Sequence, residues 1–157
     1  MLQKNGIPEK EVFADMFQEM FTLLSKIHRI SEDLLIKANC EMTHSCWIIL
    51  CIISGEPECL TVPQIAELRS TSRQAVQRQI TLLLEQGFIE TVDNPKNKRS
   101  PLYRITAEGK QYESSVSEEV YGEWLEELGL KMGIKEGERL LESLKRLSST
   151  INNISVK

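Results

Sequence analysis

The sequence lacks the features of a membrane protein or a secreted protein. No apolar run approaches the roughly 18 residues that a membrane span needs, because the longest one covers only residues 47–53. The first residues, MLQKNGIPEKE, are polar and acidic, whereas a signal peptide has a basic start followed by an apolar block. We therefore expect a cytoplasmic protein without a membrane segment.

The sequence also has few of the groups on which catalysis and metal binding depend. It contains only two histidines, and the HExxH, GxSxG, P-loop and GxGxxG motifs are absent. The four cysteines are separated by five, four and seven residues, without a CxxC pair, so they are most simply free thiols. These absences predict a protein that is not an enzyme and that holds no cofactor or metal ion.

The chain as a whole has no positive net charge, but its middle does. The formal net charge is −4, yet residues 61–110 contain eight Lys and Arg against five Asp and Glu, a balance of +3. The other residues contain eleven basic and eighteen acidic side chains, a balance of −7. A basic segment within an acidic chain suits a module that faces a polyanion.

Long amphipathic helices are predicted at both ends of the chain. From Pro8 to about Lys37 the apolar residues, many of them Met and Phe, recur three or four apart. Such a stripe could line an effector cavity, but it is more typical of a core or a dimer interface. After Thr106 as a cap, apolar residues repeat every fourth position as far as Leu128, and a last helix near 135–152 carries a stripe of Leu. Because a chain of 157 residues offers terminal helices little partner surface, a second copy is expected to cover them.

The middle of the chain predicts three short helices and a hairpin. A helix at about 45–53 follows Thr43 or Ser45 as its cap, and Thr61 with Gln64 forms a capping box for a second helix that ends near Leu68. After a turn at 69–71, a third helix runs from about Ser72 to Gln86, and Gly87 ends it in a left-handed conformation. Residues 88–92 and 102–105 read as strands around the polar loop 93–101.

The third of these helices separates its side chains onto two faces. At 100° per residue, its apolar face contains Val76, Ile80, Leu83 and Leu84, and its polar face contains Gln74, Gln77, Arg78 and Thr81. Arg forms paired hydrogen bonds with guanine and Gln with adenine, so the polar face suits base edges in a major groove. Arg73 lies beside the apolar face and is better placed for a phosphate.

Residues 60–110 resemble the winged helix-turn-helix of the MarR family, the regulators named for multiple antibiotic resistance. The resemblance rests on IAELRSTSRQAVQRQITLLLEQGFIE, the helix-turn-helix, and on DNPKNKRSPLYRITAEGK, the wing. It implies a mainly α fold, a single domain over residues 1–157. A winged helix-turn-helix at 43–106 with a two-stranded wing is flanked by dimerisation helices at 8–40 and 107–154. The implied function is that of a homodimer that binds double-stranded operator DNA of approximate two-fold symmetry. Such a dimer usually acts as a repressor, and a small-molecule effector releases it from the DNA.

The resemblance also assigns roles to individual residues. The recognition-helix positions that contact bases and phosphates are those of Ser72, Arg73, Gln74, Gln77 and Arg78, with Thr81 on the same polar face. Arg99 matches the wing Arg that enters the minor groove, where narrow A·T tracts attract guanidinium groups. Lys96 and Lys98 then lie over flanking phosphates.

Three positions depart from the family pattern. Asn97 replaces the usual Asp two residues before the wing Arg, so the ion pair that this Asp often makes is absent. Ser70 replaces the usual Gly of the turn, and Arg69 replaces a usual apolar residue just before it. The start of the recognition helix is left open, because Thr71 with Gln74 also fits a capping box that would draw Gln74 away from bases.

Other functions compete with ligand-responsive DNA binding. A thiol-based redox sensor would use Cys40 or Cys59, which lie at element ends, whereas Cys46 and Cys51 are expected to be packed and inert. Cys40, Glu41 and His44 could begin a zinc site, but the downstream histidines of the metal-sensing branch are missing. A winged-helix module that docks on another protein is the remaining alternative.

Overall fold

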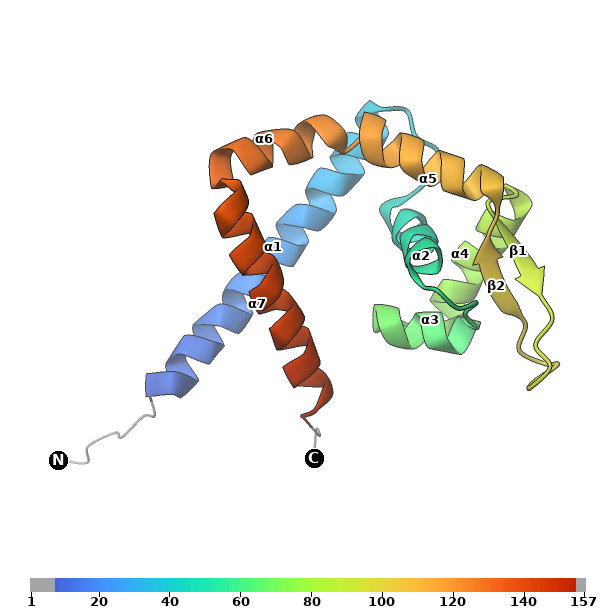
Figure 1. Ribbon diagram of the computed structural model, residues 1–157, viewed down its shortest axis with the longest axis horizontal. Helices are drawn as coiled ribbons and strands as arrows, with labels where there is room; N and C mark the ends of the chain where they lie inside the picture. The colour runs from blue at the N-terminus through green and yellow to red at the C-terminus, as the bar shows by residue number, and fades with distance from the viewer. Residues whose placement is uncertain (1–7, 155–157) are drawn as a thin grey trace. The chain divides into compact units, whose positions relative to one another are not determined.

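The computed structural model describes residues 8–154 and divides the chain into two compact units, residues 1–115 and 116–157. Its elements are α1 (Pro8–Lys37), α2 (His44–Gly55), α3 (Val62–Arg69), α4 (Arg73–Glu85), β1 (Ile89–Val92), β2 (Leu102–Ile105), α5 (Ala107–Glu119), α6 (Gly122–Met132) and α7 (Ile134–Asn152) (Figure 1). The boundary between the units lies inside α5. The expected mainly helical fold with a two-stranded wing is confirmed, and the extent of the single domain remains a prediction.

The core of the first unit is built around α2. This helix contacts α1, α3, α4 and β2, and its residues Trp47, Ile49 and Leu50 are buried. The other buried side chains on these elements include Leu35, Ile65, Val76, Ile80, Leu83 and Tyr103. Full burial of an aliphatic side chain contributes roughly 1.5 to 3 kcal/mol, so this cluster fixes how α3 and α4 are held.

The helices of the winged part begin and end at capping motifs. Thr43, one of the two caps that the sequence offered, accepts a hydrogen bond from the Cys46 amide at the start of α2, and Thr61 forms the predicted capping box with Gln64 at the start of α3. At the end of α4, Gly87 has a φ of +73°. The amides of Gly87 and Phe88 donate to the carbonyls of Leu84 and Leu83, both at 3.0 Å, which is the Schellman pattern.

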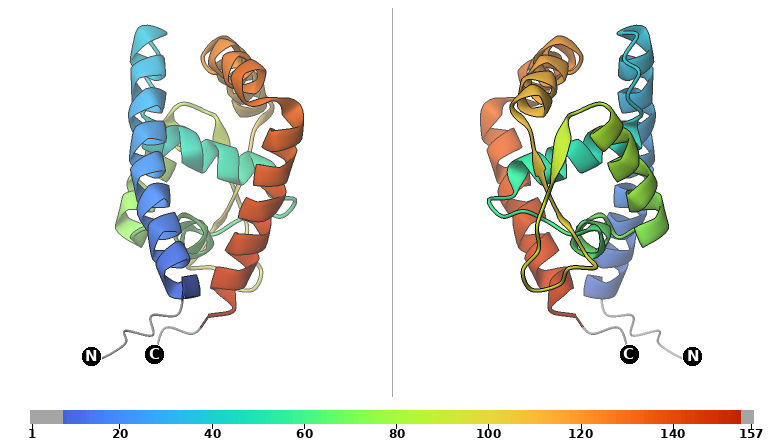
Figure 2. Two further views of the ribbon diagram at one scale, coloured as in Figure 1. Left: turned by 90° about the vertical axis from the view of Figure 1, so that its left-hand side faces the viewer. Right: turned by 90° about the vertical axis from the view of Figure 1, so that its right-hand side faces the viewer.

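The wing is an antiparallel hairpin. Ile89 pairs with Ile105 and Val92 with Leu102, and the loop 93–101 reaches away from the base of the hairpin (Figure 2). An isolated bridge adds Leu60 to the sheet, because Leu60 and Tyr103 exchange backbone hydrogen bonds of 3.2 and 2.8 Å. This bridge ties the segment before α3 to the wing.

The long helix expected after Thr106 is interrupted. A single run to Leu128 is wrong, since α5 ends at Glu119 and α6 begins at Gly122. The fourfold apolar repeat continues across the break, so periodicity gives no sign of it. Val120, Tyr121 and Gly122 have lower helix propensity than the residues on either side, which is the local reason for an interruption there.

The apolar stripes of the terminal helices are exposed within one chain. On α1 the exposed large residues are Val12, Phe13, Phe17, Phe21, Leu23, Leu24, Ile27 and Ile36. On α7 they are Ile134, Leu140, Leu141, Leu144 and Ile151. Of the two alternatives for the α1 stripe, a core or a dimer interface, this exposure favours the interface, and a second copy remains the predicted partner of both stripes. Within residues 8–154 no helix is long and apolar enough to cross a membrane.

Candidate nucleic-acid interface

The start of α4 is fixed by Ser72. Its hydroxyl accepts a hydrogen bond from the Ala75 amide at 3.1 Å, which makes Ser72 the N-cap. The alternative capping box of Thr71 with Gln74 is therefore not formed. Gln74 is exposed and takes part in no hydrogen bond within the described residues, so its amide is available to a partner molecule.

The two faces of α4 are those that the sequence predicts. Val76, Ile80 and Leu83 are fully buried. All of the expected contact residues on this helix, Ser72, Arg73, Gln74, Gln77, Arg78 and Thr81, are exposed. The Thr81 hydroxyl donates to the Gln77 carbonyl at 3.0 Å. Its methyl group and its oxygen, as an acceptor, remain for an external contact.

The turn before α4 contains a strained residue. Ser70 has φ +51° and ψ +46°, the left-handed conformation that Gly adopts without cost. It is held there because its amide and that of Thr71 donate to the carbonyls of Glu67 and Ala66, both at 3.0 Å. The polar turn noted in the sequence thus keeps the geometry for which the family usually has Gly.

Two asparagines hold the wing loop in place of the ion pair that the usual Asp at position 97 would form. The Asn94 side chain accepts hydrogen bonds from the amides of Lys96 and Asn97 and donates to the Ser100 carbonyl at 2.8 Å. Asn97 Oδ1 accepts from the Arg99 amide at 3.1 Å. The role of Asn94 was missed in the sequence, where only the composition of the loop pointed to a turn.

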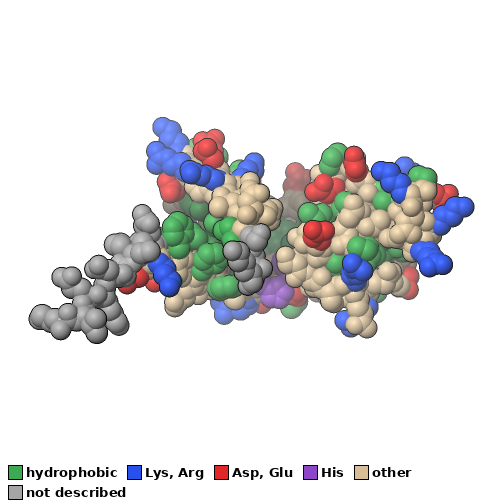
Figure 3. Space-filling view, turned by 90° about the horizontal axis from the view of Figure 1, so that it is seen from below, with side chains coloured by type: hydrophobic (Ala, Val, Ile, Leu, Met, Phe, Trp, Pro, Cys, Tyr) green, Lys and Arg blue, Asp and Glu red, His purple; other side chains and the backbone are tan. Residues whose placement is uncertain are grey.

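This arrangement leaves the cations of the wing free to face outward. Lys96, Lys98 and Arg99 are exposed, and none of the ion pairs among residues 8–154 includes them. Arg104, one strand further on, is instead paired with Glu90 at 2.6 Å. Figure 3 shows several Lys and Arg side chains at the surface of the end of the first unit that carries α4 and the wing, interspersed with Asp and Glu.

The base of the wing is clamped to the start of α5. The Thr106 amide and hydroxyl donate to the carbonyls of Phe88 and Gly87 at 3.0 and 2.7 Å, and the Thr106 hydroxyl accepts from the Gly109 amide at 3.0 Å. A Cβ on Gly109 would lie 2.0 Å from the Phe88 carbonyl oxygen, so only Gly fits there. The clamp fixes the direction in which the wing projects.

The cysteines form no pair within the described residues. Cys46 is buried, and Cys40, Cys51 and Cys59 are half-buried free thiols. Burial raises the pKa of Cys46 to about 11 and that of Cys51 to about 12, with the Glu113 carboxylate adding to the latter shift. These two are therefore poor nucleophiles, as expected. Cys40 lies 3.1 Å from the Tyr112 hydroxyl.

The two histidines lie together where α1 meets α2. Their rings are 4.6 Å apart and edge-on, and His44 Nδ1 lies 2.6 Å from the Ser31 hydroxyl. Burial lowers the pKa of His44, and the charges of His28 and Arg69 lower it further. Over the part of the chain that the structure describes, no three His, Cys, Asp or Glu residues are grouped so as to hold a metal ion.

These elements define a winged-helix protein with an exposed polar face on α4, and comparisons with known proteins agree with this fold. Residues 41–100 match the model of the MarR family. An uncharacterized protein of Mycobacterium tuberculosis is 30% identical over 105 residues, which are 67% of this chain and 71% of that protein. The chain belongs to the MarR family.

Solved structures share the fold. A mutant MarR of E. coli complexed with operator DNA has a TM-score of 0.66 at 22% identity, covering 90% of this chain and 99% of that one. A Staphylococcus aureus MarR in complex with salicylate and kanamycin has a TM-score of 0.72 at 16% identity, covering 92% of this chain and 95% of that one. At these identities the likeness establishes the winged-helix regulator fold alone.

Proposed function

We propose that this protein is a homodimeric transcription regulator that binds a specific operator by placing α4 in the major groove. The single observation that carries the proposal is the exposed polar face of α4. Gln74, Gln77 and Arg78 project from a helix whose opposite face is fully buried, so their positions are fixed while their donors and acceptors face outward.

The wing supplies a second contact. Its exposed cations, Lys96, Lys98 and Arg99, have no carboxylate partner within the described residues. In this arrangement Arg99 enters the minor groove beside the α4 site, where the potential is most negative over A·T tracts, and the two Lys neutralise phosphates. The acidic remainder of the chain keeps the attraction local to α4 and the wing.

The exposed stripes of α1 and α7 support a dimer. Large apolar side chains such as Phe13, Phe21 and Leu141 remain more than half exposed in one chain, which is costly unless another surface covers them. A second copy covers both stripes symmetrically, so the operator is an inverted repeat with one half-site for each α4. A monomer in sedimentation at micromolar concentration would contradict this part of the proposal.

The regulator acts as a repressor that responds to a small ligand. The S. aureus MarR of the same fold was solved with salicylate and kanamycin, which supports a ligand-responsive mechanism in this fold. A ligand that changes the spacing of the two α4 helices stabilises a dimer that does not fit the operator. It lowers operator affinity by a factor set by the ratio of its own affinities for the two spacings.

Alanine variants test the assigned contacts on the cognate operator. Arg78→Ala should cost about 1 to 3 kcal/mol of binding free energy and relax base preference in each half-site. Arg99→Ala should weaken binding most where the flanks are A·T-rich. Arg29→Ala, which removes the same charge from an exposed position on α1, serves as the control for net charge.

Fluorescence anisotropy at several salt concentrations reads out these effects. The slope of log affinity against log salt should fall by about 0.9 for each phosphate contact that a variant loses. Unchanged operator affinity in both Arg78→Ala and Arg99→Ala would contradict the proposed binding mode.

A further inference from the structure

The third turn of α4 exposes an apolar side chain on a helix whose outer face is otherwise polar. Leu82 is 46% exposed, whereas Val76 and Ile80 of the same helix are fully buried. Among the described residues from α2 to β2, the only other large apolar side chain in this exposed class is Leu68 on α3. The packing of the winged part therefore gives Leu82 no partner surface.

Leu82 follows Gln74 and Arg78 along one ridge of α4. Residues four apart on an α-helix are neighbours, so these three side chains form a row with a step of about 6 Å. Gln74 and Arg78 are exposed like Leu82. Beside the row, the Thr81 hydroxyl is turned back to the Gln77 carbonyl at 3.0 Å, and the Thr81 methyl group stays available. The outer face of α4 is thus polar in its first two turns and apolar in its third.

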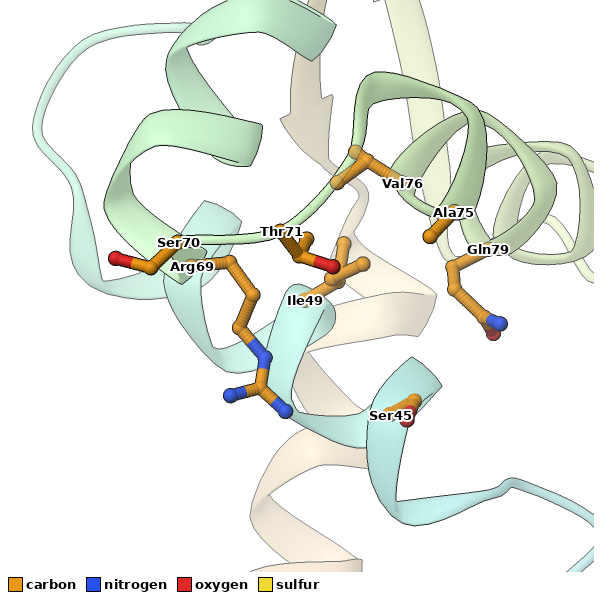
Figure 4. Close-up of a pocket in the computed structure, with 8 residues that line it drawn as sticks. All are labelled: Ser45, Ile49, Arg69, Ser70, Thr71, Ala75, Val76 and Gln79. Atoms are coloured by element: carbon orange, nitrogen blue, oxygen red, sulfur yellow. The ribbon is translucent and has the colours of Figure 1, made fainter.

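The inner flank of α4 shows on which side the helix packs against the protein. In Figure 4, Ala75, Val76 and Gln79 from the first two turns lie beside Ile49 of α2, and all four line one hollow between the two helices. Ala75 and Gln79 are half-buried there. Leu82 follows about one turn after Gln79 on this flank and is not among the lining residues. It therefore lies at the border between the flank that packs on α2 and the outer face.

An apolar side chain beside polar ones suits one feature of the major groove. The C5-methyl group of thymine is the apolar group among the base edges there, and apolar side chains contact it. This methyl group projects from the part of the base edge that is nearest to the thymine's own backbone. A side chain at the border of the outer face of a bound helix is placed to meet it, and the contact removes apolar surface from water.

We propose that Leu82 reads one thymine in each half-site through its methyl group. The inference rests on the proposed function, because that function places α4 in the major groove. A step of about 6 Å along α4 corresponds to nearly two base pairs of about 3.4 Å each, so the thymine lies about two base pairs from the one that Arg78 contacts. Glu85, the next exposed residue along this face, is an acid that phosphates repel. The contact surface of α4 therefore ends at Leu82.

Replacement of thymine by uracil in the operator tests the contact, because it removes the methyl group and keeps the hydrogen bonds of the base pair. The operator is the sequence that the wild-type protein selects from random DNA, and fluorescence anisotropy measures its affinity with a single deoxyuridine at each thymine in turn. One such replacement in each half-site should weaken binding by about fourfold, the effect of one methyl group removed from water. Replacement in both half-sites should weaken it by about fifteenfold. The sensitive thymine should lie about two base pairs from the position whose preference is lost in Arg78→Ala.

Variants of the protein assign the methyl contact to one side chain. Leu82→Ala should bind the thymine and uracil operators equally, whereas Leu82→Met, which keeps an apolar side chain of similar volume, should retain the discrimination. Leu68→Ala is the matched control, because it removes the other exposed leucine from a position on α3 beside Glu67, and it should not alter the discrimination. A role of Leu82 in stability alone would weaken binding to both operators by the same factor, so discrimination would survive in Leu82→Ala.

Equal affinity of the wild-type protein for the thymine operator and every uracil operator would overturn the proposal. Discrimination that survives in Leu82→Ala would also overturn it, because another side chain would then contact the methyl group. If Leu82→Ala instead changed the sedimentation of the DNA-free protein, Leu82 would belong to an interface between copies and the proposal would be wrong. Failure of the wild-type protein to select any sequence would contradict the proposed function itself, whereas operator binding without a uracil effect would overturn only the role of Leu82.

Discussion

The substitution Gly109→Ala tests the clamp that holds the wing. On a helix, Ala is more favourable than Gly by about 1 kcal/mol, so propensity alone predicts a more stable protein. The structure predicts the opposite, because the new Cβ would lie 2.0 Å from the Phe88 oxygen and 2.8 Å from its carbon. Reaching an ordinary contact of ~3.5 Å requires a backbone shift of roughly 1.5 Å.

That shift breaks the hydrogen bonds that Thr106 donates to the carbonyls of Phe88 and Gly87, now 3.0 and 2.7 Å long. Two such bonds contribute about 1 to 3 kcal/mol together. Overpacking adds a further cost of about 1 to 3 kcal/mol. After subtracting the helix gain, we expect Gly109→Ala to lower the free energy of unfolding by about 3 kcal/mol.

Urea unfolding followed by circular dichroism, at one fixed protein concentration, measures this difference. The control is Gly55→Ala at the exposed end of α2, where nothing lies within 4 Å of the added Cβ, and it should be neutral or slightly stabilising. If Gly109→Ala behaved like this control, the account of the clamp would be refuted.

Three further substitutions test other parts of the structure. Ser70→Gly should raise the free energy of unfolding by about 0.5 to 1 kcal/mol, because Gly adopts the observed φ of +51° without strain, and a loss of stability in urea unfolding would contradict that reading. Asn94→Ala should speed amide hydrogen exchange in residues 96–100 and leave α2 and α4 protected, because three side-chain hydrogen bonds are lost, and unchanged exchange would show that the loop is held otherwise. His44 has a lowered pKa when folded, through burial and then the charge of His28 and Arg69, so the unfolded chain takes up its proton first as the pH falls. The free energy of unfolding should therefore decrease as the pH drops below about 6.5, the ordinary pKa of His, and His44→Asn should flatten that dependence; equal slopes for both proteins would argue against it.

Local motifs made the winged part of the fold predictable. Thr61 with Gln64, and Gly87, mark helix ends through hydrogen bonds between residues three to five positions apart, so a short stretch of sequence contains both partners of each motif. The two faces of α4 followed in the same way, because one periodic pattern sets both burial and exposure.

Features that depend on distant partners were not predictable. The Thr106 clamp joins residues nearly twenty positions apart, so no local stretch of the sequence contains both of its partners. The pattern of α1 also left a core and a dimer interface open, since a helical pattern shows that a face is apolar without showing whether the same chain covers it.

Selection of bound sequences from random double-stranded DNA tests the central claim most directly. The account predicts that the wild-type protein enriches an inverted repeat whose half-sites lie about one helical turn apart, 10 to 10.5 base pairs, with A·T-rich positions beside each half-site. Replacement of Arg78 and Arg99 together by Ala should abolish that enrichment. Enrichment of no sequence by the wild-type protein, or of the same repeat by the doubly substituted one, would contradict the claim that α4 and the wing read an operator.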